Sequence, residues 1–231
     1  AVLRQRGKEK GNGRNTEKYQ NRYSFSGRIR CAECSGSFKR RIHYKPSGSY
    51  IAWCCATHLT DKGICSMKYI TDDALKRAFV TMMNKLVFGH QIVLRPLIQS
   101  LRGMNDKSQL LKMQDLESQI EKNMEQRQVL TSLMAGGYLE PALFNKESNA
   151  LAAEAEALRQ EKDSLMHCLN ENMVKADELQ KLIRFVSKGI MMTGFDDEVF
   201  LAHVESITIH SRDEAAFELK CGVSLKERLV D

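Results

Sequence analysis

The stretch CAECSGSFKRR, residues 31–41, decides how the rest of the chain is interpreted. Cys31 and Cys34 have the CxxC spacing, which lets one tight turn present two sulfurs to a single metal ion. A run of three cations, Lys39 to Arg41, begins five residues after Cys34. A CxxC pair alone is a weak signal. Its meaning therefore depends on whether further thiols and a β-hairpin lie downstream.

The other cysteines support a metal site. The chain of 231 residues has seven cysteines, and five of them fall between positions 31 and 65. Such clustering in a reducing compartment favours metal binding over disulfides. Structural zinc takes four N or S ligands, so a second pair must come from Cys54, Cys55, His58 and Cys65. Neighbouring residues of a strand point to opposite faces, so only one of Cys54 and Cys55 can be a ligand.

A β-hairpin is predicted between the cysteines. SFKRRIHY and YIAWCC are short, partly alternating segments typical of strands, and KPSGS at 45–49 is typical of a turn. The pattern C-x2-C-x20-C-x9-C is typical of a zinc ribbon. A hairpin this small cannot bury enough apolar surface to fold alone, whereas zinc contributes on the order of 10 kcal/mol of folding free energy. The metal would therefore fix the base of a cationic strand.

Charge is distributed unevenly along the chain, which has a net charge of +6. Residues 1–45 carry thirteen Lys or Arg against three Glu, a balance of +10. Residues 105–188 carry eleven Lys or Arg against fourteen Asp or Glu, a balance of −3. A basic segment of this kind indicates nucleic-acid binding. The alternative is a flexible, solubilising tail.

Helices follow the predicted hairpin. Thr71 is placed to cap a helix that starts at DDALKRAFVTMMNKL, with Asp72 and Asp73 in its first turn. A second, shorter helix is predicted over 90–102, where Pro96 limits regularity.

A heptad pattern then predicts a long helical hairpin. Alternating steps of four and three from Leu151 to Ile190 give twelve positions, ten of them apolar. The predicted seam includes Leu151, Leu158, Leu165, Leu169, Leu179 and Ile183. A weaker repeat covers 113–134, and AGGYLEPALF between the two would stop a helix. The two arms are therefore predicted to be antiparallel.

The segment after the arm predicts a short helix in FDDEVFLAHV and two strands in ESITIHSRDEAAFELKCG. Two strands alone are not stable, so they need the β-rich segment near the start of the chain. We therefore expect an α+β fold, a small zinc β-ribbon domain with helices, interrupted by a long antiparallel coiled-coil hairpin. The expected division is a basic linker at 1–24, ribbon domain at 25–104, coiled-coil arm at 105–190, and closing helix and strands at 191–231.

Three segments resemble the C-terminal part of large serine recombinases, the family of phage integrases and mobile-element transposases. They are RYSFSGRIRCAECSGSFKRR, YIAWCCATHLTDKGICSMKYI and FELKCGVSLKERL. In that family a zinc-ribbon domain is interrupted by a coiled-coil arm. The Trp-x-Cys step favours Cys55 as the third ligand, so the resemblance implies structural Zn²⁺ on Cys31, Cys34, Cys55 and Cys65. Ser35 stands where the family often has Gly.

The resemblance also implies a function. We expect sequence-specific binding to the double-stranded DNA of attachment-site arms, and subunit synapsis in the integration or excision of a mobile element. The arm would contact other recombinase subunits, and a directionality factor is a further expected partner. Nothing in the sequence resembles the family's catalytic domain, so we expect this piece of a longer recombinase to cut no DNA itself. We expect it in the bacterial cytoplasm, associated with the nucleoid and encoded by a bacterium or phage, with no membrane partner.

The expected DNA contacts are the basic side chains on and around the predicted hairpin. They are Arg28, Arg30, Lys39, Arg40, Arg41 and His43, with Lys45, Lys62 and Lys68 as weaker candidates. Most would touch phosphates, which position a protein without reading sequence. The alternative hypothesis is a zinc-stabilised coiled-coil interaction scaffold without DNA affinity. A free-standing enzyme is disfavoured, because a Cys55 or Cys65 nucleophile conflicts with a metal role.

Overall fold

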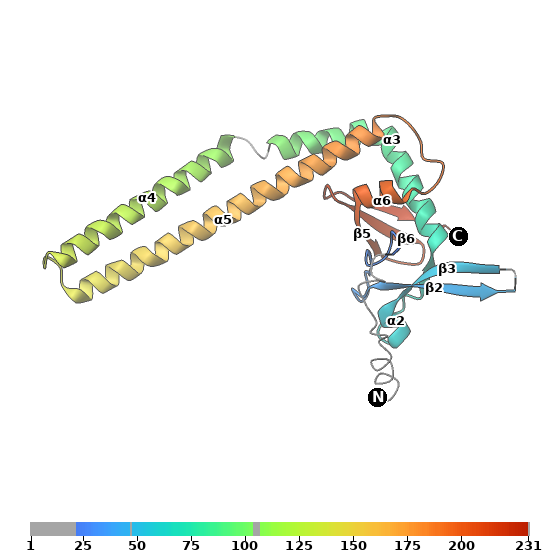
Figure 1. Cartoon of the computed structure of the whole chain (residues 1–231), viewed down its shortest axis with the longest axis horizontal. Helices are drawn as coiled ribbons and strands as arrows, with labels where there is room; N and C mark the ends of the chain where they lie inside the picture. The colour runs from blue at the N-terminus through green and yellow to red at the C-terminus, as the bar shows by residue number, and fades with distance from the viewer. Residues whose placement is uncertain (1–21, 47, 104–106, 231) are drawn as a thin grey trace, which may run out of the picture. The chain divides into compact units, whose positions relative to one another are not determined.

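The computed structural model describes residues 22–46, 48–103 and 107–230. Most of the predicted linker, 1–21, lies outside the described residues. The fold is α+β, as predicted (Figure 1). Its elements are β1 Ile29–Cys31, β2 Phe38–Lys45, β3 Gly48–Cys55, α2 Ala56–Thr60, β4 Tyr69–Thr71, α3 Asp72–Gly103, α4 Lys107–Ala135, α5 Pro141–Val186, α6 Asp197–His203, β5 Val204–Ile209, β6 Glu214–Leu219 and β7 Ser224–Arg228.

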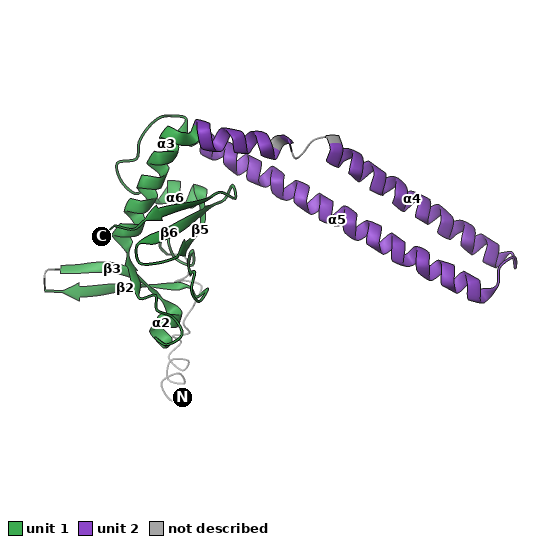
Figure 2. Cartoon of the chain, turned by 180° about the vertical axis from the view of Figure 1, so that it is seen from behind, with its two compact units in different colours: residues 1–90, 184–231 green, residues 91–183 purple. Residues whose placement is uncertain are grey.

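The chain divides into two compact units (Figure 2). Unit 1 comprises residues 1–90 and 184–231, and unit 2 comprises residues 91–183. The first border falls at 90/91, inside α3, and the second at 183/184, inside α5. Sequence reasoning placed them at 104/105 and 190/191, at the ends of the predicted helical arm.

Unit 1 contains two small sheets. One has the order β1-β5-β6-β7, and the other has the order β2-β3-β4. β1 pairs in parallel with β5, with Ile29 opposite Ile207. This pairing joins strands on either side of the long arm, so the segments before and after the arm form one body. β2 and β3 pair along eight residues, and the ribbon they make reaches out from unit 1 (Figure 1).

Aromatic rings form the core of unit 1. Phe79 of α3 packs against Phe200 of α6 and Phe217 of β6, with ring centroids 5.3 and 6.2 Å apart. Phe25 meets both Phe200 and Trp53, at 4.9 and 6.0 Å. This cluster joins the base of the β2–β3 ribbon to α6 and, through Phe200 and Phe79, to α3 and the four-stranded sheet.

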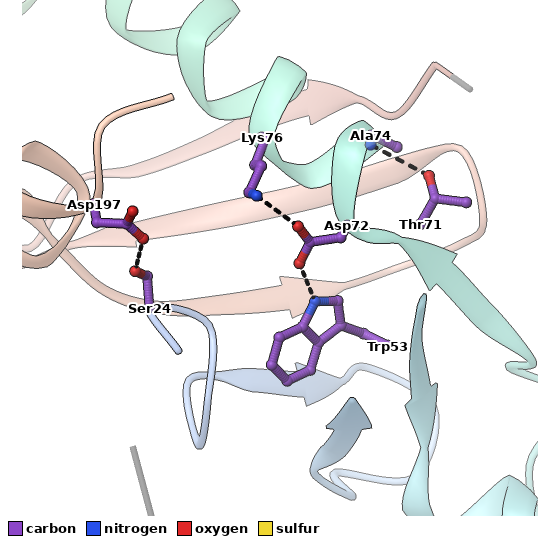
Figure 3. Close-up of polar contacts among 7 residues, drawn as sticks. All are labelled: Ser24, Trp53, Thr71, Asp72, Ala74, Lys76 and Asp197. Carbon is purple, nitrogen blue, oxygen red and sulfur yellow. Dashed lines mark hydrogen bonds and ion pairs between the residues drawn. The ribbon is translucent and has the colours of Figure 1, made fainter. Parts of the chain in front are cut away.

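Polar contacts fix the start of α3 to the same core (Figure 3). The Trp53 indole donates to Asp72 Oδ1 at 2.7 Å, and Lys76 pairs with Asp72 Oδ2 at 2.8 Å. The hydroxyl of Thr71 accepts from the Ala74 amide at 3.2 Å, so the predicted cap is confirmed. Ser24 donates to Asp197 and thereby ties the segment before β1 to the first turn of α6.

The prediction of two helices between 72 and 102 is wrong. A single helix, α3, runs from Asp72 to Gly103 and includes Pro96. Proline removes one backbone donor and crowds the preceding turn. Leu94, Ile98 and Leu101 are nonetheless buried, so apolar packing on both sides of Pro96 holds the helix together.

Unit 2 contains the predicted antiparallel hairpin, with α4 and α5 side by side (Figure 2). Gly137 has φ 74° in the turn between them, a conformation that favours glycine. Lys112–Glu161 and Lys162–Glu117 pairs, both at 2.8 Å, cross between the helices. Among the described residues, no helix is both long and apolar enough to span a bilayer.

Three elements were not predicted. β4 and α2 are short, with three and five residues. β7 has the sequence SLKER, in which charged residues hide the strand pattern. It lies at the edge of its sheet, where one side of the strand needs no partner.

Candidate metal centre and nucleic-acid interface

Four cysteine sulfurs converge at the base of the β2–β3 ribbon. They belong to Cys31, Cys34, Cys55 and Cys65, and all lie within 4.8 Å of one another. Cys31 ends β1 and Cys55 ends β3. Cys34 lies in the turn after β1, and Cys65 lies in the loop after α2. Four thiols from three separate segments thus meet at one point.

The distances between these sulfurs fit a tetrahedral ion. Cys31–Cys65 and Cys55–Cys65 are each 3.7 Å apart, and Cys34–Cys55 is 3.5 Å. A Zn–S bond of about 2.3 Å gives a tetrahedral edge of about 3.8 Å between sulfurs. The cluster is therefore consistent with a structural zinc.

The thiols lie in unequal environments. Burial raises the pKa of Cys31 and of Cys65, which disfavours their thiolates in the absence of a cation. A hydrogen bond from the Thr57 side chain lowers the pKa of Cys34 to about 6. Bringing four thiolates together in a buried site requires a compensating cation, and a zinc ion supplies that charge.

The turn that carries Cys34 has tight steric requirements. Ser35 has φ 57° and its amide donates to the Cys31 carbonyl at 2.8 Å. This left-handed backbone is the one that glycine adopts at least cost. A Cβ on Gly36 would lie 2.5 Å from Thr57 Oγ1 and 3.1 Å from Cys34 Sγ. Gly36 therefore lets α2 approach the knuckle.

Two side chains support the ligand-bearing loops from outside. Glu33 accepts hydrogen bonds from the amide and the hydroxyl of Ser66, each at 2.8 Å. It therefore links the first knuckle to the loop of Cys65, and these bonds lower the pKa of Glu33. The His58 ring donates from Nδ1 to the carbonyl oxygen of Cys65 at 2.6 Å. His58 thus positions a cysteine of the cluster, a role that sequence reasoning did not distinguish from direct ligation.

Cys54 lies on the opposite face of β3. Its sulfur is 3.8 Å from His43 Nε2, and burial raises the pKa of Cys54. This is the arrangement expected for adjacent strand residues. Cys55, and not Cys54, is the member of the adjacent pair that joins the sulfur cluster.

The cations of β2 divide between the two faces of the ribbon. In an antiparallel pair, directly opposed residues project on the same side. Lys39, Arg41, His43 and Lys45 oppose Cys54, Ala52, Tyr50 and Gly48, respectively. We call these four side chains the cationic face; its three cations, Lys39, Arg41 and Lys45, are exposed, and His43 is half-buried. Arg40 opposes Trp53 on the other side, with its guanidinium 4.1 Å from the Tyr23 ring centroid.

The remaining predicted DNA contacts are scattered. Arg30 on β1 is exposed, and so are Lys62 and Lys68 near the cluster. Arg28 is half-buried, and its Nη1 donates to the carbonyl oxygens of Val204 and Glu205 at 3.2 and 2.9 Å. Arg28 thus helps to fasten the β1 segment to β5. Its DNA role stays a prediction.

The predicted seam residues lie on the less exposed side of α5. Leu179 is buried, and Leu151, Leu158, Leu165, Leu169 and Ile183 are half-buried. Sequence reasoning did not single out a polar contact in this seam. Asn123 of α4 is buried, and its amide donates to the Leu151 carbonyl and to Glu154 at 3.1 and 3.0 Å.

Comparison with models of known protein families gives one match. Residues 24–84 match the recombinase zinc beta ribbon domain family. This match confirms the resemblance to the recombinase zinc-ribbon domain for the segment that holds the four cysteines. The match covers β1 to the first turns of α3, so the ribbon and the sulfur cluster both fall within this zinc-ribbon segment.

A solved structure described as "Crystal Structure of a LSR-DNA Complex" is also similar to the chain. The identity is 13% and the TM-score is 0.39, over 87% of this chain. This chain spans 57% of the length of that one. No curated protein matches the chain.

Proposed function

We propose that this chain binds double-stranded DNA through the cationic face of the β2–β3 ribbon, as the targeting part of a site-specific serine recombinase. Its sites would be the arms of attachment sites at which a mobile element integrates or excises. The chemistry of strand exchange would lie in another part of the parent protein. The observation that carries the proposal is the register of β2 and β3, which gathers three cations and a histidine on one side of a projecting ribbon.

A two-stranded ribbon has dimensions suited to this task, because the major groove of B-DNA admits one. Lysine and arginine on such a ribbon can reach phosphates on either side of the groove, and arginine can also read guanine at the groove floor. The cationic face carries both residue types. Its side chains project from a paired strand, so their spacing is fixed before DNA arrives.

Zinc would act on DNA binding indirectly. Cys55 ends β3, and β2 begins four residues after Cys34, so an ion held by the cluster clamps both strands at the base of the ribbon. Zn²⁺ supplies folding free energy here and no chemistry of its own. Cys31, Cys34, Cys55 and Cys65 would hold it.

Salt-dependent DNA binding by single-arginine variants tests the proposal. Arg41→Ala should weaken binding to the ends of the parent element and reduce the slope of log Kobs against log salt by about one, the value for one lost phosphate contact. Arg40→Ala removes the same charge from the other side of the same strand, so it is the matched control and should have the smaller effect. If the Arg40→Ala, Arg41→Ala double variant binds like the wild type, the ribbon is not the DNA-binding element.

A scaffold without DNA affinity is the second candidate. It is favoured by apolar side chains exposed near the α4–α5 turn, where Tyr138, Val129 and Leu133 are 82%, 58% and 41% exposed. Its signature would be self-association of the wild-type chain together with no DNA binding at any salt concentration. The same gel-shift series, read beside sedimentation of the free protein, separates the two functions.

A further inference from the structure

A row of aromatic rings with a cation at each end continues the cationic face beyond β2. The Lys45 ammonium lies 4.6 Å from the Tyr50 ring centroid, and Tyr50 stacks on His43 at 5.1 Å. The ring centroids of His43 and Tyr69 are 5.8 Å apart, and the Arg212 guanidinium lies 5.2 Å from the Tyr69 ring centroid. The row therefore runs from the hairpin tip to a residue near the end of the chain.

The row crosses from one sheet to the other. Tyr69 of β4 opposes Cys54 of β3, and Cys54 opposes Lys39 of β2, so Tyr69 projects on the cationic face. Arg212 comes from the turn between β5 and β6, in the four-stranded sheet. Sequence reasoning gave this turn no role, because Arg212 is some 140 residues from Tyr69 along the chain.

The surface on both sides of Tyr69 is hollowed and lined by more cations than acids. One hollow, of 280 Å³, has Arg212 and Arg228 in its lining, together with Asp213. The other, of 450 Å³, has Lys45 and Arg77, together with Asp73. Tyr69 and Thr71 line both hollows, so the two adjoin. Four cations against two carboxylates leave this surface positive.

We propose that Arg212 is a DNA-phosphate contact, so that one DNA strand follows the surface from Lys45 past Tyr69 to the β5–β6 turn. This inference rests on the proposed function and adds a contact from the closing segment of the chain. Arg212 is exposed, and stacking on Tyr69 limits the conformational freedom that an arginine loses when it binds. A guanidinium held in this way can donate to phosphate oxygens in its plane while its face covers the ring.

The salt dependence of binding to a mixed-sequence double-stranded DNA tests this contact, because phosphate contacts do not depend on sequence. Arg212→Gln should lower the slope of log Kobs against log salt by about one. Lys188→Gln is the control, since Lys188 is an exposed cation of the same unit outside the row. It should leave the slope unchanged. Arg212→Lys keeps the charge and should restore the slope.

A second variant separates the ring from the charge. Tyr69→Leu keeps apolar bulk but removes the aromatic face, so Arg212 should lose its fixed position and affinity should fall several-fold. Because the two residues act as a unit, the Tyr69→Leu, Arg212→Gln double variant should lose less binding free energy than the two single variants lose together. Fully additive losses would show that Tyr69 does not position Arg212.

The outcomes distinguish this proposal from the one on which it rests. Equal slopes for Arg212→Gln, Lys188→Gln and the wild type, with Arg41→Ala still defective, would exclude Arg212 from the interface and leave the ribbon as the binding element. Wild-type protein that binds no DNA would overturn both proposals. Circular dichroism melts of each variant confirm that it is folded, which is expected for a substitution at an exposed turn.

Discussion

Cys54 and Cys55 are identical side chains in adjacent positions, yet the structure gives them different surroundings. Both are buried, at 4% and 0% exposure, so removing either sulfur costs similar packing. Only Cys55 is within contact distance of the other three thiols. The pleat of β3 is the cause, because it sends consecutive side chains to opposite faces.

Alanine at each position should therefore give different results. We expect Cys55→Ala to lose bound zinc and to lower the melting temperature strongly, because metal binding contributes on the order of 10 kcal/mol to such folds. Cys54→Ala should retain one zinc per chain and lose only about 1 kcal/mol of stability through packing. Zinc content by elemental analysis and thermal melts of both variants check this. Equal zinc content in the two variants would contradict the assignment.

Sequence reasoning at the residue scale succeeded where spacing alone limits the geometry. The CxxC turn follows from the spacing of its two cysteines, and the exclusion of one of Cys54 and Cys55 follows from the alternation of side chains along a strand. The role of His58 could not be found in this way, because it depends on how the loop of Cys65 folds back to place a carbonyl 2.6 Å from the ring. The same limit applies to Glu33, whose partner Ser66 is 33 residues away.

At the scale of elements, the paired helices α4 and α5 show how a seam can specify its own register. Asn123 is 2% exposed in an otherwise largely apolar seam, and its Nδ2 reaches both the Leu151 carbonyl and the Glu154 carboxylate. A single buried asparagine is a known means of fixing the alignment of paired helices, because other registers leave its amide nitrogen without these partners. The contact to Glu154 adds a charge-assisted hydrogen bond.

The isosteric change Asn123→Asp should destabilise the arm. It replaces a donor by a carboxylate facing Glu154 in a buried site, so we expect a loss of about 2 kcal/mol or more. Asn170→Asp makes the same change at an exposed position of α5 and should cost little. Thermal unfolding followed by helical circular dichroism measures both. Similar melting curves would show that the Asn123 contact does not specify the pairing.

Elements with strong periodicity were predictable, and those that depend on tertiary contacts were not. The heptads and the break at AGGYLEPALF located α4 and α5. The predicted interruption of the helix before Pro96 is absent. Local sterics disfavour proline in a helix, but the packing of the buried residues around Pro96 outweighs that cost. β7 was missed because its charges conceal its alternation, and it becomes a strand by pairing with β6.

At the scale of the whole molecule, the pairing of β1 with β5 has a functional consequence. Parallel pairing in unit 1 joins segments separated by more than 170 residues, so the helical arm can vary without breaking the body that carries the ribbon. The pairing of segments on either side of the arm could be predicted from their order, because the two strands after the arm need strand partners from the part of the chain before it. The position of Arg212 beside Tyr69 was not foreseeable, because it depends on how the two sheets pack.

We also propose that the helical arm pairs DNA-bound subunits, so DNA binding and pairing should be separable by mutation. Leu158 and Leu165 lie half-buried in the seam of α5, whereas the cationic face belongs to unit 1. We expect the Leu158→Glu, Leu165→Glu variant to bind a single attachment half-site with wild-type affinity and to lose the pairing of DNA-bound subunits. The reason is that charged side chains in the seam disrupt the helical arm, while unit 1 retains its own core.

Ala157→Glu with Ser164→Glu is the matched control, because it adds the same two charges with the same spacing at exposed positions of α5. It should retain both half-site binding and pairing. Gel shifts with one half-site measure binding, and gel shifts or sedimentation with two full sites measure pairing. Loss of half-site binding in the seam variant, with the control intact, would show that the arm is needed for DNA recognition itself. The two units would then have to act as a single DNA-binding device, contrary to the separation proposed here.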